Sequence, residues 1–254
     1  FERAMRDYLI ATCRKPRMLQ NDQDGGTMFM TSDYAHPEFL VDTSWVEEHL
    51  NDANVRIVDC DLPDQFQRAH LPRAVVQKDH YQKRVKTGRV DIYNTEEFSI
   101  FAEELGIGDD TLVIAYDNSM GLYAARLWWA LKYYGHHSVK IMNGGWRKWL
   151  KEGRPITTEV VSPVGEFKFT AQPDSTLIAT KQQILDDYKY PDVVIWDVRS
   201  RGEFLGETTR GNRRPGRIPG AVHLEWMNSV DIDTHLLKSA SELRAMFEEH
   251  GITP

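Results

Sequence analysis

The hydrophobic positions of the chain alternate between two spacings from about residue 40 onward. Largely apolar runs of strand length occur at 55–58, 112–116 and 139–142, as in strands that a parallel sheet buries on both faces. Between these runs, apolar residues recur every three or four positions at 95–105, at 124–134 and from Trp146 onward, which predicts amphipathic helices. Thr43 or Ser44 is expected to cap another helix that runs to Leu50. This alternation predicts an α/β fold around a small, mainly parallel sheet flanked by helices.

The stretch at 111–135 is the most informative of these patterns. Its strand is joined to its helix by a short loop at 117–123, and Gly135 ends the helix as a C-terminal cap. Such a loop directs backbone N–H groups and the positive end of a helix dipole into one concavity, which suits an anion or a thiolate. Asp117 stands where this loop would carry a nucleophile.

The landmarks of the first half recur in the second half, in the same order. The offsets between matched landmarks are 137, 138, 147 and 145 residues, and they rise mainly where residues 206–215 are inserted. This order predicts a tandem duplication. The matched pairs are Leu40-Val41-Asp42-Thr43 with Leu177-Ile178-Ala179-Thr180, Ile57-Val58-Asp59-Cys60 with Ile195-Trp196-Asp197-Val198, Leu71-Pro72-Arg73-Ala74 with Ile218-Pro219-Gly220-Ala221, and Gly106-Ile107 with Gly251-Ile252.

The duplication and the loss of periodicity elsewhere divide the chain into four parts. Residues 1–36 are expected to be a disordered leader, 37–156 a first domain, 157–173 an extended linker, and 174–254 a second domain that is incomplete at its C-terminus. Glu2 and Asp7 weigh against a transit peptide in the basic leader, and no apolar core typical of a secretory signal is present. The sequence is therefore interpreted as a fragment of a longer protein.

The composition of the chain argues against two classes of function, nucleic-acid binding and membrane spanning. A net charge of −7 argues against a general nucleic-acid binder, and no apolar run reaches the roughly 20 residues that a membrane span needs. Two cysteines in 254 residues cannot form a disulfide framework, which predicts a reducing, cytoplasmic location. Neither a nucleic acid nor a membrane is therefore expected as a partner.

The ordered landmarks resemble those of the rhodanese family, in particular the two-domain thiosulfate and 3-mercaptopyruvate sulfurtransferases. The resemblance covers residues 40–254 and is carried by three motifs, which are Ala124-Ala125-Arg126-Leu127-Trp128-Trp129, Asn143-Gly144-Gly145-Trp146-Arg147-Lys148-Trp149, and Asp197-Val198-Arg199-Ser200 with Arg217-Ile218-Pro219-Gly220-Ala221. It implies two rhodanese-like domains, of which the second carries a catalytic cysteine on a loop before a helix. That cysteine takes sulfane sulfur from a small anionic donor and passes it to cyanide or a thiol, without a metal or organic cofactor.

No catalytic residue of this kind is expected within the chain. A carboxylate cannot form a persulfide, so Asp117 marks the inactive copy of the loop. The offset of 145 places the nucleophile of the second copy near position 262, beyond Pro254. Cys60 is expected to be a buried structural thiol. Cys13 is followed by Pro16-Arg17-Met18 where glycine and a helix start would be needed, so its similarity to a sulfurtransferase loop is attributed to chance. As given, the chain is therefore predicted to be inactive.

Six residues are candidates for substrate binding, each with a simpler alternative. The insertion brings Arg213 and Arg214 close to Arg217, and these could attract anionic donors, although a solvated loop also explains them. Arg199 follows a predicted strand and could bind substrate or only shape the cleft. The resemblance places Leu122 and Tyr123 over the neighbouring active site, whereas a core or interface role is an equal alternative.

The remaining polar landmarks are assigned structural roles. Asp59 and Asp197 end equivalent strands and are expected to cap nearby backbone groups. His136 and His137 follow Gly135 with no Cys or carboxylate at metal-ligand spacing, so they are expected to be exposed and no metal site is predicted. Two functions remain open, which are a tandem rhodanese-type sulfurtransferase and a non-catalytic rhodanese-like module that binds a partner or an anion. The residue near position 262 distinguishes them.

Overall fold

The computed structural model describes residues 33–78, 82–84, 90–209, 211 and 213–253. The chain forms two compact units. Unit 1 consists of Glu38–Ile178 together with the separate segment Val230–Leu237, and unit 2 is built mainly of Ala179–Ser229 and the chain from Lys238 onward. Most of the predicted leader, through residue 32, lies outside the described residues, and so does Cys13. Among the described residues, no helix is long and apolar enough to cross a membrane.

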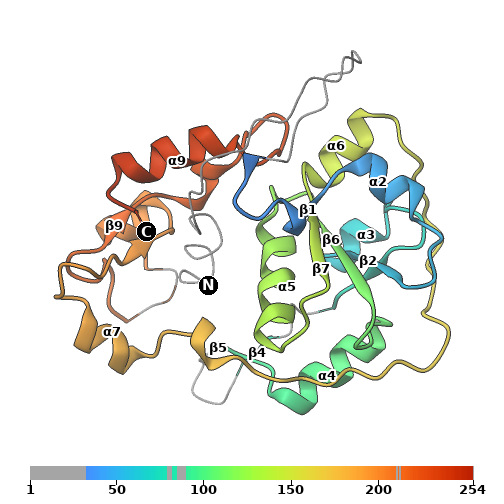
Figure 1. Cartoon of the computed structure of the whole chain (residues 1–254), viewed down its shortest axis with the longest axis horizontal. Helices are drawn as coiled ribbons and strands as arrows, with labels where there is room; N and C mark the ends of the chain where they lie inside the picture. The colour runs from blue at the N-terminus through green and yellow to red at the C-terminus, as the bar shows by residue number, and fades with distance from the viewer. Residues whose placement is uncertain (1–32, 79–81, 85–89, 210, 212, 254) are drawn as a thin grey trace, which may run out of the picture. The chain divides into compact units, whose positions relative to one another are not determined.

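Unit 1 is organised around a five-stranded parallel sheet (Figure 1). The strand order is β1-β7-β6-β2-β3, and every neighbouring pair in it is parallel. The central strands carry the apolar runs recognised in the sequence, which explains why they are buried on both faces. The strands are β1 (Leu40–Val41), β2 (Val55–Asp59), β3 (Val75–Val76), β6 (Leu112–Tyr116) and β7 (Val139–Met142), and a separate antiparallel pair is formed by β4 (Gln82–Arg84) and β5 (Val90–Ile92).

Helices cover both faces of this sheet, as the alternation predicted. Ile57 and Ile114 are paired in register and belong to a core cluster with residues of α2, α3 and α6. Side chains alternate across a strand, so α5 covers the opposite face (Figure 1). The helices of unit 1 are α2 (Thr43–Glu48), α3 (Pro63–Phe66), α4 (Thr95–Glu104), α5 (Leu122–Tyr133) and α6 (Gly145–Lys151).

Both ends of α2 differ from the sequence expectation, whereas α4 begins at Thr95 as predicted. Asp42, not Thr43 or Ser44, is the N-cap of α2 and accepts a hydrogen bond from the Ser44 N–H, and the helix ends at Glu48. The start of α4 is fixed by a capping box between Asn94 and Glu97, which satisfies two backbone donors that would otherwise lack partners.

The segment predicted as a linker has no helix or strand between Lys151 and Ser175, yet it packs along unit 1. His70 and Thr157 form an antiparallel bridge. Phe169 is buried against Phe98 and His136. The expectation that His136 is exposed is therefore wrong. Its ring is 5 % exposed, its Nε2 lies 2.9 Å from the Thr111 carbonyl oxygen, and burial lowers its pKa.

Unit 2 contains a parallel pair of short strands, β8 (Trp196–Asp197) and β9 (Val222–His223). Trp196 anchors its core, because its indole N–H donates to the Leu224 carbonyl over 2.7 Å and its ring packs against Phe247. The helices of unit 2 are α7 (Lys181–Asp187), α8 (Arg201–Leu205) and α9 (Ala240–Glu249), with the 3-10 turn η4 (Trp226–Ser229). The 3-10 turn η3 (Ser175–Leu177) lies in unit 1.

Candidate functional site

The loop after β6 closes around the carboxylate of Asp117, which is 1 % exposed. Its Oδ1 accepts the backbone N–H groups of Ser119 and Gly121 over 2.9 and 2.8 Å. Its Oδ2 accepts those of Tyr123 and Ala124, both over 2.8 Å. The N–H groups expected from the strand–loop–helix pattern do converge on an anion. That anion is the side chain of Asp117 itself.

The Asn143-Gly144-Gly145-Trp146 motif brings the start of α6 against this loop. The Trp146 N–H donates to the Asp117 carbonyl oxygen over 2.9 Å. At Gly145, where φ is +51°, an added Cβ would lie 2.2 Å from the same oxygen. Only glycine permits this approach of two backbones, so the second glycine of the motif fixes the loop.

Two more buried carboxyl groups lie beside the loop. Asp61 Oδ2 accepts the Asn118 N–H over 2.6 Å and Oδ1 accepts the Ser119 hydroxyl over 3.1 Å. Asp59 accepts the Tyr116 hydroxyl over 2.5 Å and the Asp61 N–H over 2.9 Å. Burial, with the negative charge of Asp117, raises the pKa of both Asp59 and Asp61 to about 6. The unit 1 loop is therefore surrounded by acidic groups, which oppose an anionic substrate.

Cys60 lies next to these carboxyl groups but is not a reactive thiol. It is fully buried, and burial together with the nearby aspartates raises its pKa well above the ordinary value. A nucleophilic cysteine needs an accessible thiolate. The prediction of a buried structural thiol at Cys60 is confirmed.

Leu122 and Tyr123 form the first turn of α5, and both are partly exposed. The Tyr123 backbone N–H is one of the four N–H groups that form a cradle around the Asp117 carboxylate. A role for these two side chains at a neighbouring active site remains a prediction.

In unit 2, Arg199 follows β8 and is held by several contacts. Its Nε and Nη2 donate to the two carboxylate oxygens of Asp197 over 2.9 and 2.6 Å, and Nη2 also donates to the Gly216 carbonyl. Burial opposes the charge of Asp197, but the hydrogen bonds from Arg199 outweigh it and lower the pKa of that carboxyl group. The imidazole of His223 bonds to the Arg199 carbonyl over 2.9 Å. The guanidinium is thus fixed in position before any ligand binds.

Three of the four predicted substrate-binding arginines line one recess of unit 2. This recess has a volume of about 780 Å³ and includes Arg199, Arg214 and Arg217. Lys181 adds a fourth positive charge, Asp197 contributes a negative one, and the remaining lining residues are mostly apolar. Arg217 lies over the Phe204 ring at 4.5 Å. Arg213 is exposed and does not line the recess.

The two units place different residues at equivalent positions. In β2 and β3, Val58 pairs with Val75 and Asp59 with Val76. In β8 and β9, Trp196 pairs with Val222 and Asp197 with His223. These residues lie 138 and 147 positions after their counterparts in β2 and β3. Asp61 and Arg199 each stand two residues after the aspartate that ends the strand. In unit 1 this position faces the 117–124 loop, and in unit 2 the acid is replaced by a base.

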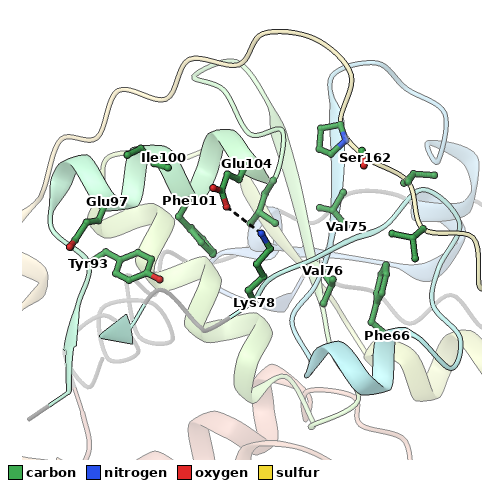
Figure 2. Close-up of a pocket in the computed structure, with 14 residues that line it drawn as sticks. Phe66, Val75, Val76, Lys78, Tyr93, Glu97, Ile100, Phe101, Glu104 and Ser162 are labelled. Carbon is green, nitrogen blue, oxygen red and sulfur yellow. Dashed lines mark ion pairs between the residues drawn. The ribbon is translucent and has the colours of Figure 1, made fainter. Parts of the chain in front are cut away.

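A separate pocket of about 510 Å³ lies in unit 1 beside α4 and β3. Figure 2 shows Lys78 extending toward Glu104, with which it forms an ion pair at 3.7 Å. The other lining residues are mostly apolar and include none of the candidates named from the sequence. In the described part of the chain, no group of three or more His, Cys, Asp or Glu residues is arranged to hold a metal ion.

Known proteins resemble this chain over most of its length. The family model described as "Rhodanese-like domain" matches residues 42–152. A sulfur carrier protein, TtuD, of Thermus thermophilus is 40 % identical over 235 residues, covering 87 % of this chain and 80 % of that protein. The thiosulfate sulfurtransferase of Gallus gallus is 31 % identical over 229 residues, covering 84 % and 78 %.

A solved structure supports the same assignment. The Escherichia coli protein SseA, described as having the "Rhodanese" fold of 3-mercaptopyruvate sulfotransferases, is 26 % identical, with a TM-score of 0.74. The match covers 84 % of each chain. Together with the parallel sheet and the loop before α5, these similarities show that the chain belongs to the rhodanese-like family.

Proposed function

We propose that this chain is part of a tandem sulfurtransferase that moves sulfane sulfur from thiosulfate or 3-mercaptopyruvate to cyanide or a thiol. In the reaction with thiosulfate, a cysteine thiolate attacks the outer sulfur, the S–S bond breaks, and sulfite leaves with the electron pair. The acceptor then attacks the outer sulfur of the persulfide and releases the thiolate. Each step exchanges one bond at sulfur, so neither a metal nor an organic cofactor is needed.

Unit 1 does not supply the nucleophile in this proposal. Asp117 occupies the nucleophile position, and its oxygens already accept four backbone N–H groups. The buried Asp59 and Asp61 add negative charge where an anionic donor would have to enter. We assign unit 1 a structural role, and we place the nucleophile near position 262, which is 145 residues after Asp117.

The structure of unit 2 supports the proposal that a further segment of the protein carries this nucleophile. In unit 1, the core cluster includes Ile114 and Tyr116 from β6, Met142 from β7 and Trp149 from α6. These elements follow α4, the counterpart of α9, and unit 2 has no further helix or strand among its described residues. The recess lies on the counterpart of that core. Counted from the helix N-caps Asp42 and Thr180, the buried Val46 matches the partly exposed Ile184, which lines the recess. A strand–loop–helix segment like 111–151 would complete it.

One observation carries the assignment to sulfur transfer, namely the position of Arg199. Its counterpart Asp61 bonds to the first two residues after the nucleophile position of unit 1. In a completed unit 2, Arg199 would therefore lie beside the nucleophile loop. A fixed guanidinium there would lower the pKa of a thiol and bind an anionic donor. Arg214 and Arg217 would extend the positive field toward the solvent.

Thiocyanate formation from thiosulfate and cyanide tests this proposal. The chain as given is expected to be inactive, and a version extended through a cysteine near position 262 is expected to be active. In the extended protein, Arg199→Met should raise KM for thiosulfate about tenfold or more, which corresponds to about 1.4 kcal/mol. Arg68→Met, at an exposed site in unit 1, is the control. Activity of the chain as given would contradict the absence of a nucleophile from it.

The double variant Arg213→Ala, Arg214→Ala tests the predicted steering of donors by the insertion. An unchanged KM for thiosulfate in the extended protein would exclude that role. An aspartate or serine near position 262 would instead favour the alternative function, a non-catalytic module that binds a partner or an anion. We propose a cytoplasmic location, since a persulfide intermediate and the free thiol of Cys60 suit a reducing compartment.

A further inference from the structure

A short turn from the second half of the chain belongs to unit 1. Val230–Leu237 is separated in sequence from the rest of unit 1, and both of its neighbours in the chain, Ser229 and Lys238, belong to unit 2. An antiparallel bridge between Val230 and Leu237 closes the turn. The Asp231 carboxylate accepts the N–H groups of Asp233 and Thr234 and shapes it internally. The turn is therefore a preformed unit that docks as a whole.

The turn contacts the start of α6, next to the loop that contains Asp117. The Leu237 N–H donates to Asn143 Oδ1 over 2.9 Å. Leu236 packs close to Gly144, because a Cβ added there would lie 3.1 Å from the Leu236 Cδ2 atom. Arg147 Nη1 lies 3.5 Å from His235 Nε2. Of these contacts, the one between Arg147 and His235 depends on a group that titrates near neutral pH.

The geometry of His235 favours the neutral imidazole. An arginine guanidinium only donates hydrogen bonds, so the contact with Arg147 requires a lone pair on His235 Nε2. The proton of the neutral ring is then on Nδ1, which is buried and has no hydrogen-bond partner within the described structure. Protonation would place an N–H opposite the N–H of Arg147 and bring two positive charges together. The backbone of His235 lies in the left-handed region, at φ +59°.

The groups around His235 shift its pKa in both directions. Burial and the positive charge of Arg147 lower its pKa, whereas Asp117, from the loop after β6, and Asp231, from its own turn, raise it. The net direction is downward. This agrees with a ring whose neutral form is stabilised by docking.

We propose that the Val230–Leu237 turn is a pH-sensitive clasp on α6, held while the His235 imidazole is neutral and released when it is protonated. The clasp does not depend on sulfur transfer, since its residues are not the nucleophile or the donor-binding arginines. Its release would free Asn143 and the glycine pair that positions the Asp117 loop. A drop in pH would thereby loosen the contact between the turn and the start of α6.

Hydrogen exchange at the Leu237 amide measures the clasp directly, because this N–H is bonded to Asn143 only when the turn is docked. Exchange of the full chain would be followed by NMR as the pH falls from neutral, with correction for the intrinsic exchange rate. Protection at Leu237 is expected to fall about tenfold for each unit by which docking lowers the pKa of His235. In His235→Gln the protection should not depend on pH in this range.

Two further variants separate a clasp from a merely structural role. Arg147→Met removes the opposing charge, so NMR titration should show the pKa of His235 rising, and the loss of Leu237 protection on acidification should become smaller. His137→Gln removes an exposed histidine of the same unit and should change neither quantity. The proposal is overturned if Leu237 protection has the same pH dependence in the wild type and in His235→Gln, or if Arg147→Met changes neither the pKa of His235 nor the size of the protection loss.

Discussion

Asp59 makes the stability of unit 1 depend on pH in a specific direction. Burial raises its pKa from 3.8 to about 6, reinforced by the charge of Asp117 and opposed by hydrogen bonds from Tyr116 and Asp61. Because the pKa is higher in the folded state than in the unfolded state, the folded state binds the proton more tightly. The resulting stabilisation is fully present below pH 3.8 and is lost as the pH rises through about 6.

The magnitude follows from the shift of about two pKa units. At 1.36 kcal/mol per unit, the full contribution is about 3 kcal/mol, of which about 2 kcal/mol is present at a pH of about 4.5. Asp59→Asn removes this proton equilibrium. The free energy of unfolding of the wild type, relative to the variant, should therefore increase by about 2 kcal/mol between pH values of about 7.5 and 4.5. Urea unfolding followed by tryptophan fluorescence measures it, since Trp149 is fully buried in unit 1.

The wild type and Asp59→Asn are compared through the change in their free energies of unfolding between the two pH values, because the substitution also destabilises the folded state by an amount that does not depend on pH. The two oxygens of Asp59 each accept a hydrogen bond, so the amide of asparagine places a donor against a donor, which costs about 1–3 kcal/mol at both pH values. Asp52→Asn, at an exposed site of unit 1, is the control and should follow the wild type. A difference that stays constant within about 0.5 kcal/mol across the two pH values would refute the reasoning.

Three other substitutions test the packing of unit 1. Phe169→Ala should lower the free energy of unfolding by about 3–5 kcal/mol in urea, and should expose 155–174 to proteases. Gly145→Ala should cost at least about 2 kcal/mol in the same assay, because its Cβ would overlap the Asp117 carbonyl oxygen. Lys148→Met removes a hydrogen-bond partner of Asp42. Burial raises the pKa of Asp42, but hydrogen bonds, including the one from Lys148, outweigh it and lower this pKa to about 2. The stabilisation from Asp42 is present above pH 3.8 and is lost as the pH falls through about 2. The variant should lose only about 1 kcal/mol at neutral pH, since Asp42 is half exposed, and its acid unfolding should begin at a higher pH. No change in the acid midpoint would contradict this role of Lys148.

The strands and helices of unit 1 were predictable because their burial is recorded in the spacing of apolar residues. The run at 112–116 corresponds to β6 without error, since a strand buried on both faces must be apolar throughout. Helix ends were less accurate, because they depend on single hydrogen bonds such as the one that Asp42 accepts from Ser44. The burial of His136 was missed because its cause, Phe169, lies far along the chain.

The loop around Asp117 was located from the sequence, but its neighbours were not. The strand–loop–helix pattern predicts converging N–H groups wherever it occurs. Nothing in a local pattern shows that Asp61 reaches across from the neighbouring strand to the same loop, or that the Val230–Leu237 turn docks beside it. A comparison of Asp61 with Arg199, each two residues after an aspartate that ends a strand, could have indicated the difference in charge between the two units.

The carboxylate of Asp117 is, in effect, a ligand that unit 1 carries permanently. Its connection to the chain gives it an effective concentration in the cradle that a free anion could match only at about millimolar levels or above. Sulfate or thiosulfate in solution must therefore compete with a group that never diffuses away. The loop therefore keeps its shape without any bound ligand.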